Sequence, residues 1–292
     1  MQVRTLIGAR DVSHGIRCLA SLERYCQGLK EILIFDDGTL TVADQKLLSS
    51  ALTRCRIITH QERNSHVESC LRDFPHCAQF RRENPLFQKL FDVVLYDSAS
   101  EAIIYCDSDV LFFKPFQMTD LSADNNVDMI FMADDSYAYS LYPWHLCGRH
   151  AVRIGANVNT GVVVARKSKM NLGIIEAFLA RTDVQSKLRF TSCWAEQTCW
   201  AVLAAHCRSA LFDSGQLRLA SISDAERRDN KLVGLHFVSS VRQLLHDCRD
   251  ERSVETAVTD VRYVPIEPLN AGKVLLTMLS RLSRRVPSFN RL

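Results

Sequence analysis

The feature that most constrains the fold is the alternation of strand and helix patterns in the first 60 residues. Short apolar runs at 5–8, 31–35 and 56–59 have the composition of strands, and the stretches 16–26 and 43–52 carry apolar residues at helical spacing. Strands that alternate with helices predict a mainly parallel sheet with helices on both faces. We therefore expect an α/β fold of the Rossmann-like type.

The same alternation continues along the chain. Further strand patterns lie at 102–106, 129–133 and 161–165, and further helical patterns lie at 85–95, 171–182 and 195–205. The polar segment 60–83 is predicted to be a loop with one short helix. From residue 211 onward the strand patterns are short and irregular, and the last is at 232–237. We expect one domain over residues 1–250 and a C-terminal extension over 251–292.

Composition and charge exclude several classes of protein. Of the 292 residues, 47% are hydrophobic and 24% charged, which is an ordinary globular balance. The 36 basic and 33 acidic residues are too evenly matched for a surface that binds nucleic acid, so we expect no nucleic-acid partner. The 11 cysteines are odd in number and form no C-x-x-C pair, which favours reduced thiols. No signal peptide or membrane-spanning run is visible, and we expect a cytoplasmic protein.

Two acidic residues, Asp107 and Asp109, follow the strongly apolar strand pattern at 102–106. Side chains at positions i and i+2 of an extended chain share a face, so the two carboxylates are expected to lie together. Two like charges at the end of a buried strand are costly unless a cation lies between them. Mg²⁺ and Mn²⁺ take oxygen ligands, and open α/β sheets place ligands at the carboxyl ends of their strands. The pair therefore predicts a divalent metal site.

In this setting the segment 103–113 resembles the D-x-D motif of A-type glycosyltransferases, especially the retaining glycogenin and lipopolysaccharide galactosyltransferase family. Further segments resemble motifs of that family and occur in the family's order: 6–11 with Ser21 and Leu22, 157–164, 194–197 and 235–242. The late segment departs from the family pattern, because Ser239 and Arg242 stand where glycine and lysine are usual. It also lacks the proline and tryptophan that usually follow.

The resemblance implies a glycosyltransferase domain over residues 1–250 that uses a UDP-sugar donor and Mn²⁺ or Mg²⁺. It implies a glycan or lipid-linked acceptor and retention of the donor's anomeric configuration. The implied metal ligands are Asp107, Asp109 and His236. The implied catalytic residues are Glu196 and Asn159. Glu196 would stabilise positive charge on the sugar in a retaining enzyme or act as general base in an inverting one. The implied substrate-binding residues are Asp11, Asp36, Lys89, Asp107, Asn159, Gly161, Gln197 and Arg242.

The sequence also bears on three other functions. The segment 35–40 is similar to the nucleophile motif of haloacid-dehalogenase phosphatases, but Asp36 and Asp37 are adjacent and point to opposite faces of an extended chain. No Gly-Asp dipeptide supplies that family's later metal motif. A sugar-nucleotide pyrophosphorylase needs a longer glycine-rich loop than the one at 8–10. An inactive transferase fold that only binds nucleotide remains the alternative.

The tail at 271–292 combines basic and apolar residues and contains no acidic one. Its basic residues are Lys273, Arg281, Arg284, Arg285 and Arg291, and its apolar residues at helical spacing are Leu275, Met278, Leu279 and Leu282. Such a helix either packs its apolar face on the catalytic domain or lies on an anionic membrane surface. The second alternative predicts a peripheral location at the inner face of a membrane.

Overall fold

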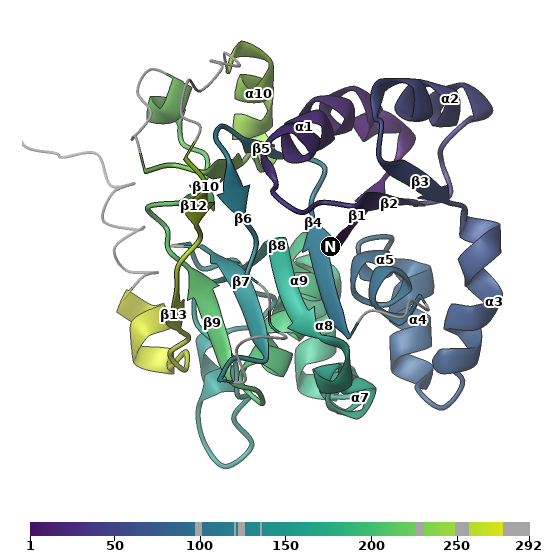
Figure 1. The fold of residues 1–292 in the computed structure, drawn as a ribbon. Coiled ribbons are helices and arrows are strands. Elements are labelled where there is room, and N and C mark those ends of the chain that lie inside the picture. Colours follow the sequence, from purple (N-terminus) through teal and green to yellow (C-terminus); the bar gives the residue numbers. More distant parts are fainter. Residues whose placement is uncertain are drawn as a thin grey trace, which may run out of the picture.

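The computed structural model describes residues 1–96, 101–119, 121, 126–134, 136–225, 231–248 and 257–276. In this part of the chain, eleven strands form one mixed sheet, and most of its elements follow the α/β pattern that the sequence predicts (Figure 1). The main path of the sheet runs β3, β2, β1, β4, β8, β7, β10, β11, β5, while β9 pairs with β7 and β13. The predicted α/β fold with a mainly parallel sheet is confirmed.

The first part of the sheet is parallel. Its strands are β1 (Gln2–Ile7), β2 (Glu31–Asp36), β3 (Cys55–Ile58) and β4 (Ala102–Cys106). Alternate side chains of β2 enter different cores: Ile32 and Ile34 pack on one face, and Leu33 and Phe35 on the other. Burial on both faces explains why this strand is apolar without a polar position in its centre.

The centre of the sheet changes direction at β8 (Val158–Arg166). This strand is antiparallel to both β4 and β7 (Met129–Ala133), and it begins three residues earlier than the predicted strand at 161–165. The backbone N–H of Asp107 donates to the carbonyl oxygen of Gly161 over 2.7 Å, which extends the β4–β8 pairing to the acidic pair. The acidic segment and the asparagine-glycine segment are therefore hydrogen-bonded neighbours.

The later strands complete the sheet on its other side. They are β5 (Val110–Phe112), β9 (Ser209–Phe212), β10 (Leu217–Leu219), β11 (Gly234–His236) and β13 (Tyr263–Pro265). Antiparallel pairing of β11 with β5 sets His236 opposite Val110, directly after the acidic pair. A separate pair is formed by β6 (Phe116–Gln117) and β12 (Thr259–Asp260).

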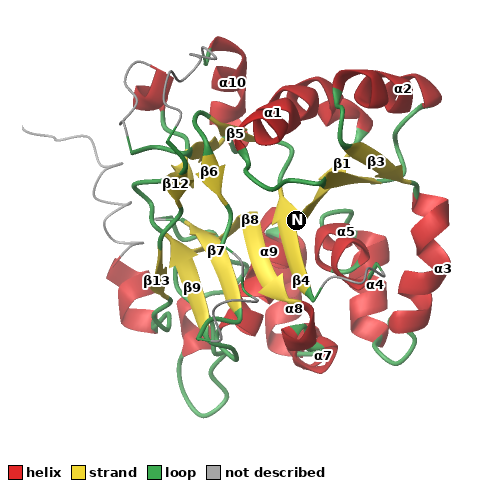
Figure 2. Cartoon of the chain, in the orientation of Figure 1, coloured by secondary structure: helices red, strands yellow, loops and turns green. Residues whose placement is uncertain are grey.

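Helices cover both faces of the sheet (Figure 2). One face is packed by α1 (Val12–Tyr25) and α2 (Val42–Ala51), whose buried residues share a core with β1 and β2. The other is packed by α5 (Phe87–Leu90), α6 (Asp92–Leu95), α7 (Leu172–Leu179), α8 (Thr182–Phe190) and α9 (Ser192–Ala204). Further short helical elements are η1 (Ala9–Asp11), η2 (Pro143–Leu146), η3 (Lys167–Lys169), η4 (Ile222–Ala225), η5 (Ser239–Gln243) and α10 (Leu244–Asp247).

The predicted loop over residues 60–83 was wrong. This segment forms two helices, α3 (His60–Cys70) and α4 (Pro75–Glu83). They are joined to α6 by a buried charge cluster, in which Asp92 accepts from Arg63 Nε over 2.8 Å and from Arg81 Nε over 2.6 Å. The predicted helix at 171–182 corresponds to α7, which ends at Leu179. The following helix α8, which begins at Thr182 and ends at Phe190, was not predicted.

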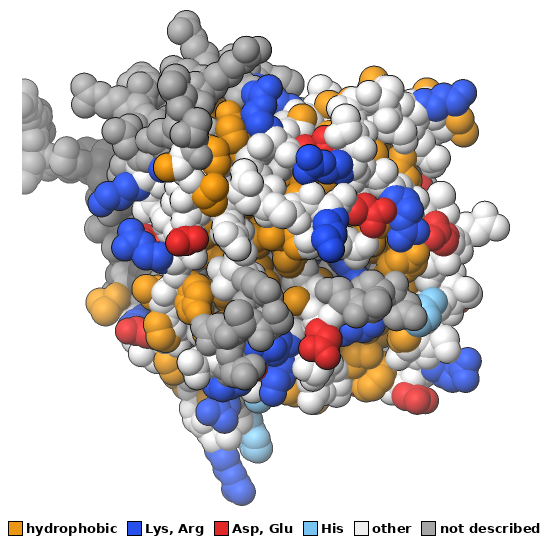
Figure 3. All heavy atoms as spheres, viewed as in Figure 1, with side chains coloured by type: hydrophobic (Ala, Val, Ile, Leu, Met, Phe, Trp, Pro, Cys, Tyr) orange, Lys and Arg blue, Asp and Glu red, His pale blue; other side chains and the backbone are white. Residues whose placement is uncertain are grey.

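The C-terminal part of the chain contacts the sheet through β13, which pairs with β9. Residues 271–276 are helical, and Val274 is buried in the main core while Leu275 and Leu276 are exposed. The rest of the predicted tail helix, residues 277–292, lies outside the described residues. No helix in the described ranges has the length and apolar character to cross a membrane. On the face drawn in Figure 3, basic and acidic side chains are interspersed with apolar ones.

Candidate active site

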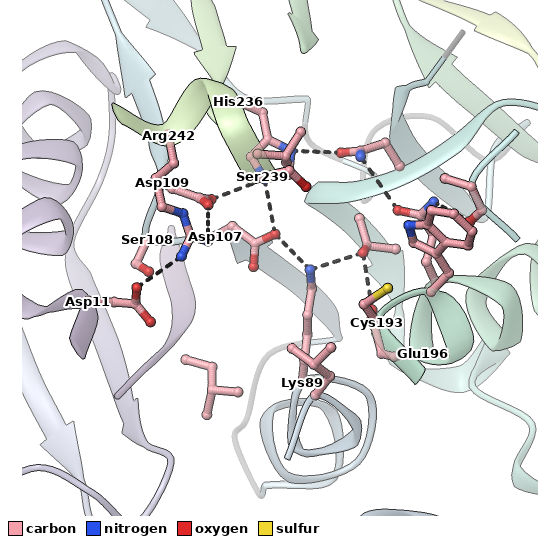
Figure 4. A pocket seen from close by; sticks show the side chains of 18 of the residues that line it. Asp11, Lys89, Asp107, Ser108, Asp109, Cys193, Glu196, His236, Ser239 and Arg242 are labelled. Carbon is pink, nitrogen blue, oxygen red and sulfur yellow. Dashed lines mark hydrogen bonds and ion pairs between the residues drawn. The ribbon is translucent and has the colours of Figure 1, made fainter. Parts of the chain in front are cut away.

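A cavity of about 450 Å³ opens where several strands end, and it collects most of the residues that the motifs single out. Asp107 and Asp109 follow β4, His236 ends β11, and Asn159 lies near the start of β8. Lys89 reaches the cavity from α5 and Glu196 from the first turn and a half of α9 (Figure 4). The position is the one expected for a ligand site in an open α/β sheet, and the volume suits a small organic molecule.

Asp107, Asp109 and His236 form a compact group of ligand atoms. One nitrogen or oxygen atom from each lies within 4.8 Å of the others. His236 Nε2 is 3.0 Å from Asp109 Oδ1 and 3.5 Å from Asp107 Oδ2. Two carboxylates and an imidazole are a donor set that suits Mn²⁺, and the carboxylates suit Mg²⁺. The residues that the sequence predicts as metal ligands are thus brought together from segments 129 residues apart.

The orientation of His236 is fixed by Asn159. Asn159 Oδ1 accepts from the backbone N–H of Gly161 over 2.9 Å, and this bond identifies it as the oxygen of the side-chain amide. The same oxygen lies 2.9 Å from His236 Nδ1. Nδ1 therefore donates to this oxygen, and Nε2 is the ring nitrogen that faces the two aspartates. A second residue supports the amide, because Gln197 Oε1 lies 3.5 Å from Asn159 Nδ2 and Gln197 Nε2 donates to a backbone carbonyl. This arrangement sets the tautomer that a metal-binding histidine needs.

Gly161 makes room for that histidine. A Cβ atom built on Gly161 would lie 2.3 Å from His236 Nδ1, which is far inside van der Waals contact. The close approach at this glycine is therefore made by the imidazole. Gly161 itself does not line the cavity.

Lys89 and Tyr105 hold Asp107 from two sides. Lys89 Nζ donates to Asp107 Oδ2 over 2.8 Å and to Thr160 Oγ1 over 3.0 Å, while the Tyr105 hydroxyl donates to Asp107 Oδ1 over 2.6 Å. Burial lowers the pKa of Lys89, but the charges of Asp107 and Glu196 outweigh it and the net pKa is raised. Lys89 is therefore a buried permanent cation at the floor of the cavity.

Arg242 is the second cation of the site. Its Nη2 lies 2.5 Å from Asp109 Oδ2 and its Nη1 lies 3.1 Å from Asp11 Oδ1. Although burial acts in the opposite direction, His236 and Arg242 hold the pKa of Asp109 at about 2. The loop that carries Arg242 turns at Ser239, whose φ of 51° is in the left-handed region. A glycine adopts this region without strain, which explains the glycine that is usual at this place in the family that the sequence resembles.

Glu196 is buried beside these charges without being paired to them. Its Oε2 accepts from Thr160 Oγ1 over 3.3 Å, and its Oε1 has no hydrogen bond; the indole N–H of the nearby Trp200 has none either. Burial raises the pKa of Glu196 to about 7, with the cation of Lys89 opposing and the charge of Asp107 adding to the shift. A carboxyl group with a pKa near neutrality can hold or release a proton at working pH.

The charge balance of the cavity tests whether a divalent cation fits. Among the described residues, six carboxyl groups line it, from Asp11, Asp37, Asp107, Asp109, Asp134 and Glu196, against the two cationic side chains of Lys89 and Arg242. A nucleotide diphosphate would meet repulsion in such a cavity unless a further cation is present. The oxygen-rich donor set and the oriented Nε2 atom of His236 both fit Mn²⁺ or Mg²⁺.

The structure separates the predicted substrate-binding residues into two groups. Asp11, Lys89, Asp107, Asn159, Gln197 and Arg242 line the cavity. Asp36 and Gly161 do not: Asp36 Oδ1 accepts from the backbone N–H groups of Gly38 and Leu40, and the neighbouring Asp37 lines the cavity instead. Sequence reasoning missed Tyr105, Thr160 and Asp134. The first two adjoin recognised motif residues, while Asp134 follows the β7 strand pattern as a polar residue after an apolar run.

No family model and no curated protein matches the chain. Among solved structures, the galactosyltransferase LgtC in complex with donor and acceptor sugar analogs is 12% identical, with a TM-score of 0.48 over 85% of this chain and 91% of LgtC. Mouse xyloside xylosyltransferase 1 is 13% identical, with a TM-score of 0.45 over 81% of this chain and 97% of that one.

The bifunctional glycosyltransferase WbbM is 10% identical, with a TM-score of 0.50 over 88% of this chain and 50% of WbbM. The present chain therefore spans about half the length of that protein. At 10% identity this likeness concerns the fold alone. The chain has the fold of the A-type nucleotide-sugar glycosyltransferases.

Proposed function

We propose that the protein is a divalent-metal-dependent glycosyltransferase that transfers a hexose-type sugar from a UDP-sugar to a glycan or lipid-linked acceptor. The observation that carries the proposal is the convergence of Asp107, Asp109 and His236 in an acidic cavity at the strand ends. A phosphatase of the haloacid-dehalogenase type is disfavoured, since Asp36 is engaged by two backbone N–H groups.

The residues around the triad divide into donor-binding and positioning groups. Asp107, Asp109 and His236 would hold Mn²⁺ or Mg²⁺, which when bound neutralises the charge that builds up on the departing UDP. Lys89 and Arg242 supply cationic hydrogen-bond donors on either side of the triad. Asp11 and Asp37 line the cavity near the end of β1, where the resemblance places the base and ribose.

Asn159 and Glu196 are the proposed catalytic residues. In a retaining reaction the ionised Glu196 carboxylate, which lines the cavity, would stabilise positive charge on the sugar ring. In an inverting reaction it would instead accept the proton of the acceptor hydroxyl. We propose retention, and NMR of the anomeric centre of a newly formed glycoside decides between the two.

The metal assignment is tested by nucleotide binding. Thermal shift with UDP and MnCl₂ is expected to stabilise the wild-type chain by mass action. Asp107→Asn and Asp109→Asn should lose this stabilisation, and Asp73→Asn, a change at an exposed aspartate outside the cavity, should keep it. Equal stabilisation of the wild type and both variants would show that the pair binds no metal.

The alternative of an inactive fold has a distinct outcome. It predicts metal-dependent UDP binding that the Asp107 and Asp109 variants lose, but no release of UDP from any UDP-sugar in the presence of an acceptor library. Hydrolysis or transfer that also disappears in the Asp109 variant would instead establish an enzyme.

We further propose a cytoplasmic location, with the basic tail 271–292 at the inner face of a membrane. The exposed Leu275 and Leu276 beside Lys273 support this placement. Co-sedimentation with anionic vesicles should be strong for the full chain and weak for a chain that ends at Asn270. Equal sedimentation of the two chains, or none, would remove the membrane contact.

A further inference from the structure

The most exposed aromatic side chains of the described residues lie on two hydrogen-bonded stretches, η2 with the residues before it, and the end of α8 with the start of α9. Among all described phenylalanine, tryptophan and tyrosine residues, those classed as exposed are Trp144, Phe190 and Trp194, with 62%, 81% and 38% of their surface accessible. Trp194 lines the cavity of the candidate active site. Several large aromatic side chains that are exposed to solvent close to one another indicate a binding surface.

Two of these rings belong to an ordered cluster, which we name the aromatic platform and define as Tyr142, Trp144, Lys187 and Phe190. The rings of Tyr142 and Trp144 are stacked, with centroids 4.2 Å apart and an interplanar angle of 15°. Lys187 Nζ lies 4.6 Å from the centroid of Tyr142 and 5.2 Å from that of Phe190. The lysine therefore joins the η2 segment to the end of α8 through cation–π contacts, and the rings are held in place before any ligand arrives.

Both chain segments of the platform lead into the cavity. Before Tyr142, the chain passes Ser136 and Ala138, which line the cavity; after Phe190, it reaches Cys193 and Trp194, which also line it. The Cα atoms of Phe190 and Trp194 are at most about 14 Å apart, the reach of four extended residues.

Hydrogen bonds fasten these two segments to each other. Ser140 Oγ donates to the carbonyl oxygen of Thr191 over 2.7 Å, and the Ser140 N–H donates to Thr198 Oγ1 over 2.8 Å. These bonds hold the stretch before η2 against the end of α8 and the start of α9, so the platform keeps a fixed position relative to Trp194.

We propose that the aromatic platform binds sugar rings of an oligosaccharide acceptor whose reacting end enters the cavity past Trp194. This inference rests on the proposed function and names its acceptor class. A pyranose ring has an apolar C–H face that packs on an aromatic ring and hydroxyl groups at its edge that need polar partners. The platform offers both, because Lys187 Nζ lies close to the rings of Tyr142 and Phe190.

A glycan array and a peptide array, both probed with the labelled full-length protein, test this assignment. The glycan array carries each saccharide series from disaccharide to hexasaccharide, and binding to the hits is then measured by calorimetry. We expect affinity to rise with chain length. Trp144→Ala and Phe190→Ala should each weaken binding of the longer members about tenfold, in line with the loss of a stacked ring, and leave the disaccharide unchanged. Val42→Ala removes an exposed apolar side chain on α2, outside the platform and the cavity lining, and should change neither.

The outcomes separate this inference from the proposed function. UDP binding in MnCl₂ is measured on the same variants, and both should bind it as the wild type does. If the wild type binds UDP but no glycan, or if glycan affinity is independent of length or of Trp144 and Phe190, the platform assignment is overturned while the donor site stands. Peptide binding that both variants lose, without glycan binding, would identify a protein acceptor and equally overturn it. Glycan binding with the expected losses but without UDP binding would leave the platform and remove the transferase.

Discussion

Replacing Gly161 by alanine is the most direct test of how the metal-binding histidine is held. The added Cβ would lie 2.3 Å from Nδ1, 2.7 Å from Cε1 and 2.8 Å from Cγ of His236. Gly161 does not have a positive φ, so the alanine backbone itself is unstrained and the clash with the ring decides the outcome. The imidazole has to move, and its hydrogen bond to Asn159 is lost with it. Overpacking costs about 2 kcal/mol and the buried hydrogen bond about 1 kcal/mol, so we expect a loss of about 3 kcal/mol.

Urea unfolding measures this loss, and calorimetry with MnCl₂ and UDP measures its effect on the site. Metal affinity should fall by about 10-fold to 100-fold, the usual result of disturbing a residue that orients a ligand. Gly173→Ala is the matched control, because Gly173 is exposed in α7 and its added Cβ would meet only Asn171 Oδ1 at 3.2 Å. In the double variant with His236→Ala the clash is absent, so the two losses of stability should not add. Unchanged stability and unchanged metal affinity in Gly161→Ala would refute the packing argument.

Three further predictions concern the charges and the backbone of the site. Lys89→Met leaves Asp107 without its cation and should lower stability by about 3 kcal/mol in metal-free buffer, while MnCl₂ should raise the melting temperature of this variant more than that of the wild type. The pKa of Glu196 is raised from 4.5 to about 7, so the folded state binds a proton that the unfolded state releases. The contribution of Glu196 to the free energy of unfolding should therefore be lost as the pH rises from about 4.5 to 7, and the total loss should be about 3 kcal/mol. Urea unfolding across this range should show this pH dependence in the wild type and not in Glu196→Gln. Ser239→Gly should stabilise the fold by about 1 kcal/mol because it relieves a left-handed φ, and a melting temperature below that of the wild type would contradict this.

The central strands could be predicted because each is a short continuous run of residues whose buried side chains are apolar. The pattern at 102–106 and at 129–133 coincides with β4 and β7, since every core position is filled by an apolar side chain. Helices α3 and α4 escaped prediction for the opposite reason. Part of what they bury is charged: Arg63 and Arg81 enclose Asp92, and no hydrophobic period marks the buried face of α3. Hydrophobic periodicity does not predict a helix whose buried contacts include ion pairs.

The candidate site shows the same division. The order of the motifs was enough to place Asp107, Asp109 and His236 together, although nothing in the sequence gives the distance between them. The support of Asp107 by Tyr105 was missed, because a tyrosine inside an apolar strand has the same pattern as a core residue. The role of Gly161 was also not visible, since the atom that needs the space belongs to a residue 75 positions later.

The triad joins two parts of the sheet that are anchored differently. Asp107 follows β4, which is hydrogen-bonded along its length to β8 in the interior of the sheet, whereas His236 ends β11, a three-residue strand that lies next to the last strand of the path. We expect amide protons in the first part to exchange with solvent only through near-global opening, and those around His236 to exchange through smaller openings. A ligand that is bound by both parts must be released before the region around His236 can open, so it raises the free energy of these smaller openings most. In hydrogen–deuterium exchange, MnCl₂ with UDP is therefore expected to slow β11 and η5 strongly and to leave β4 and β8 almost unchanged.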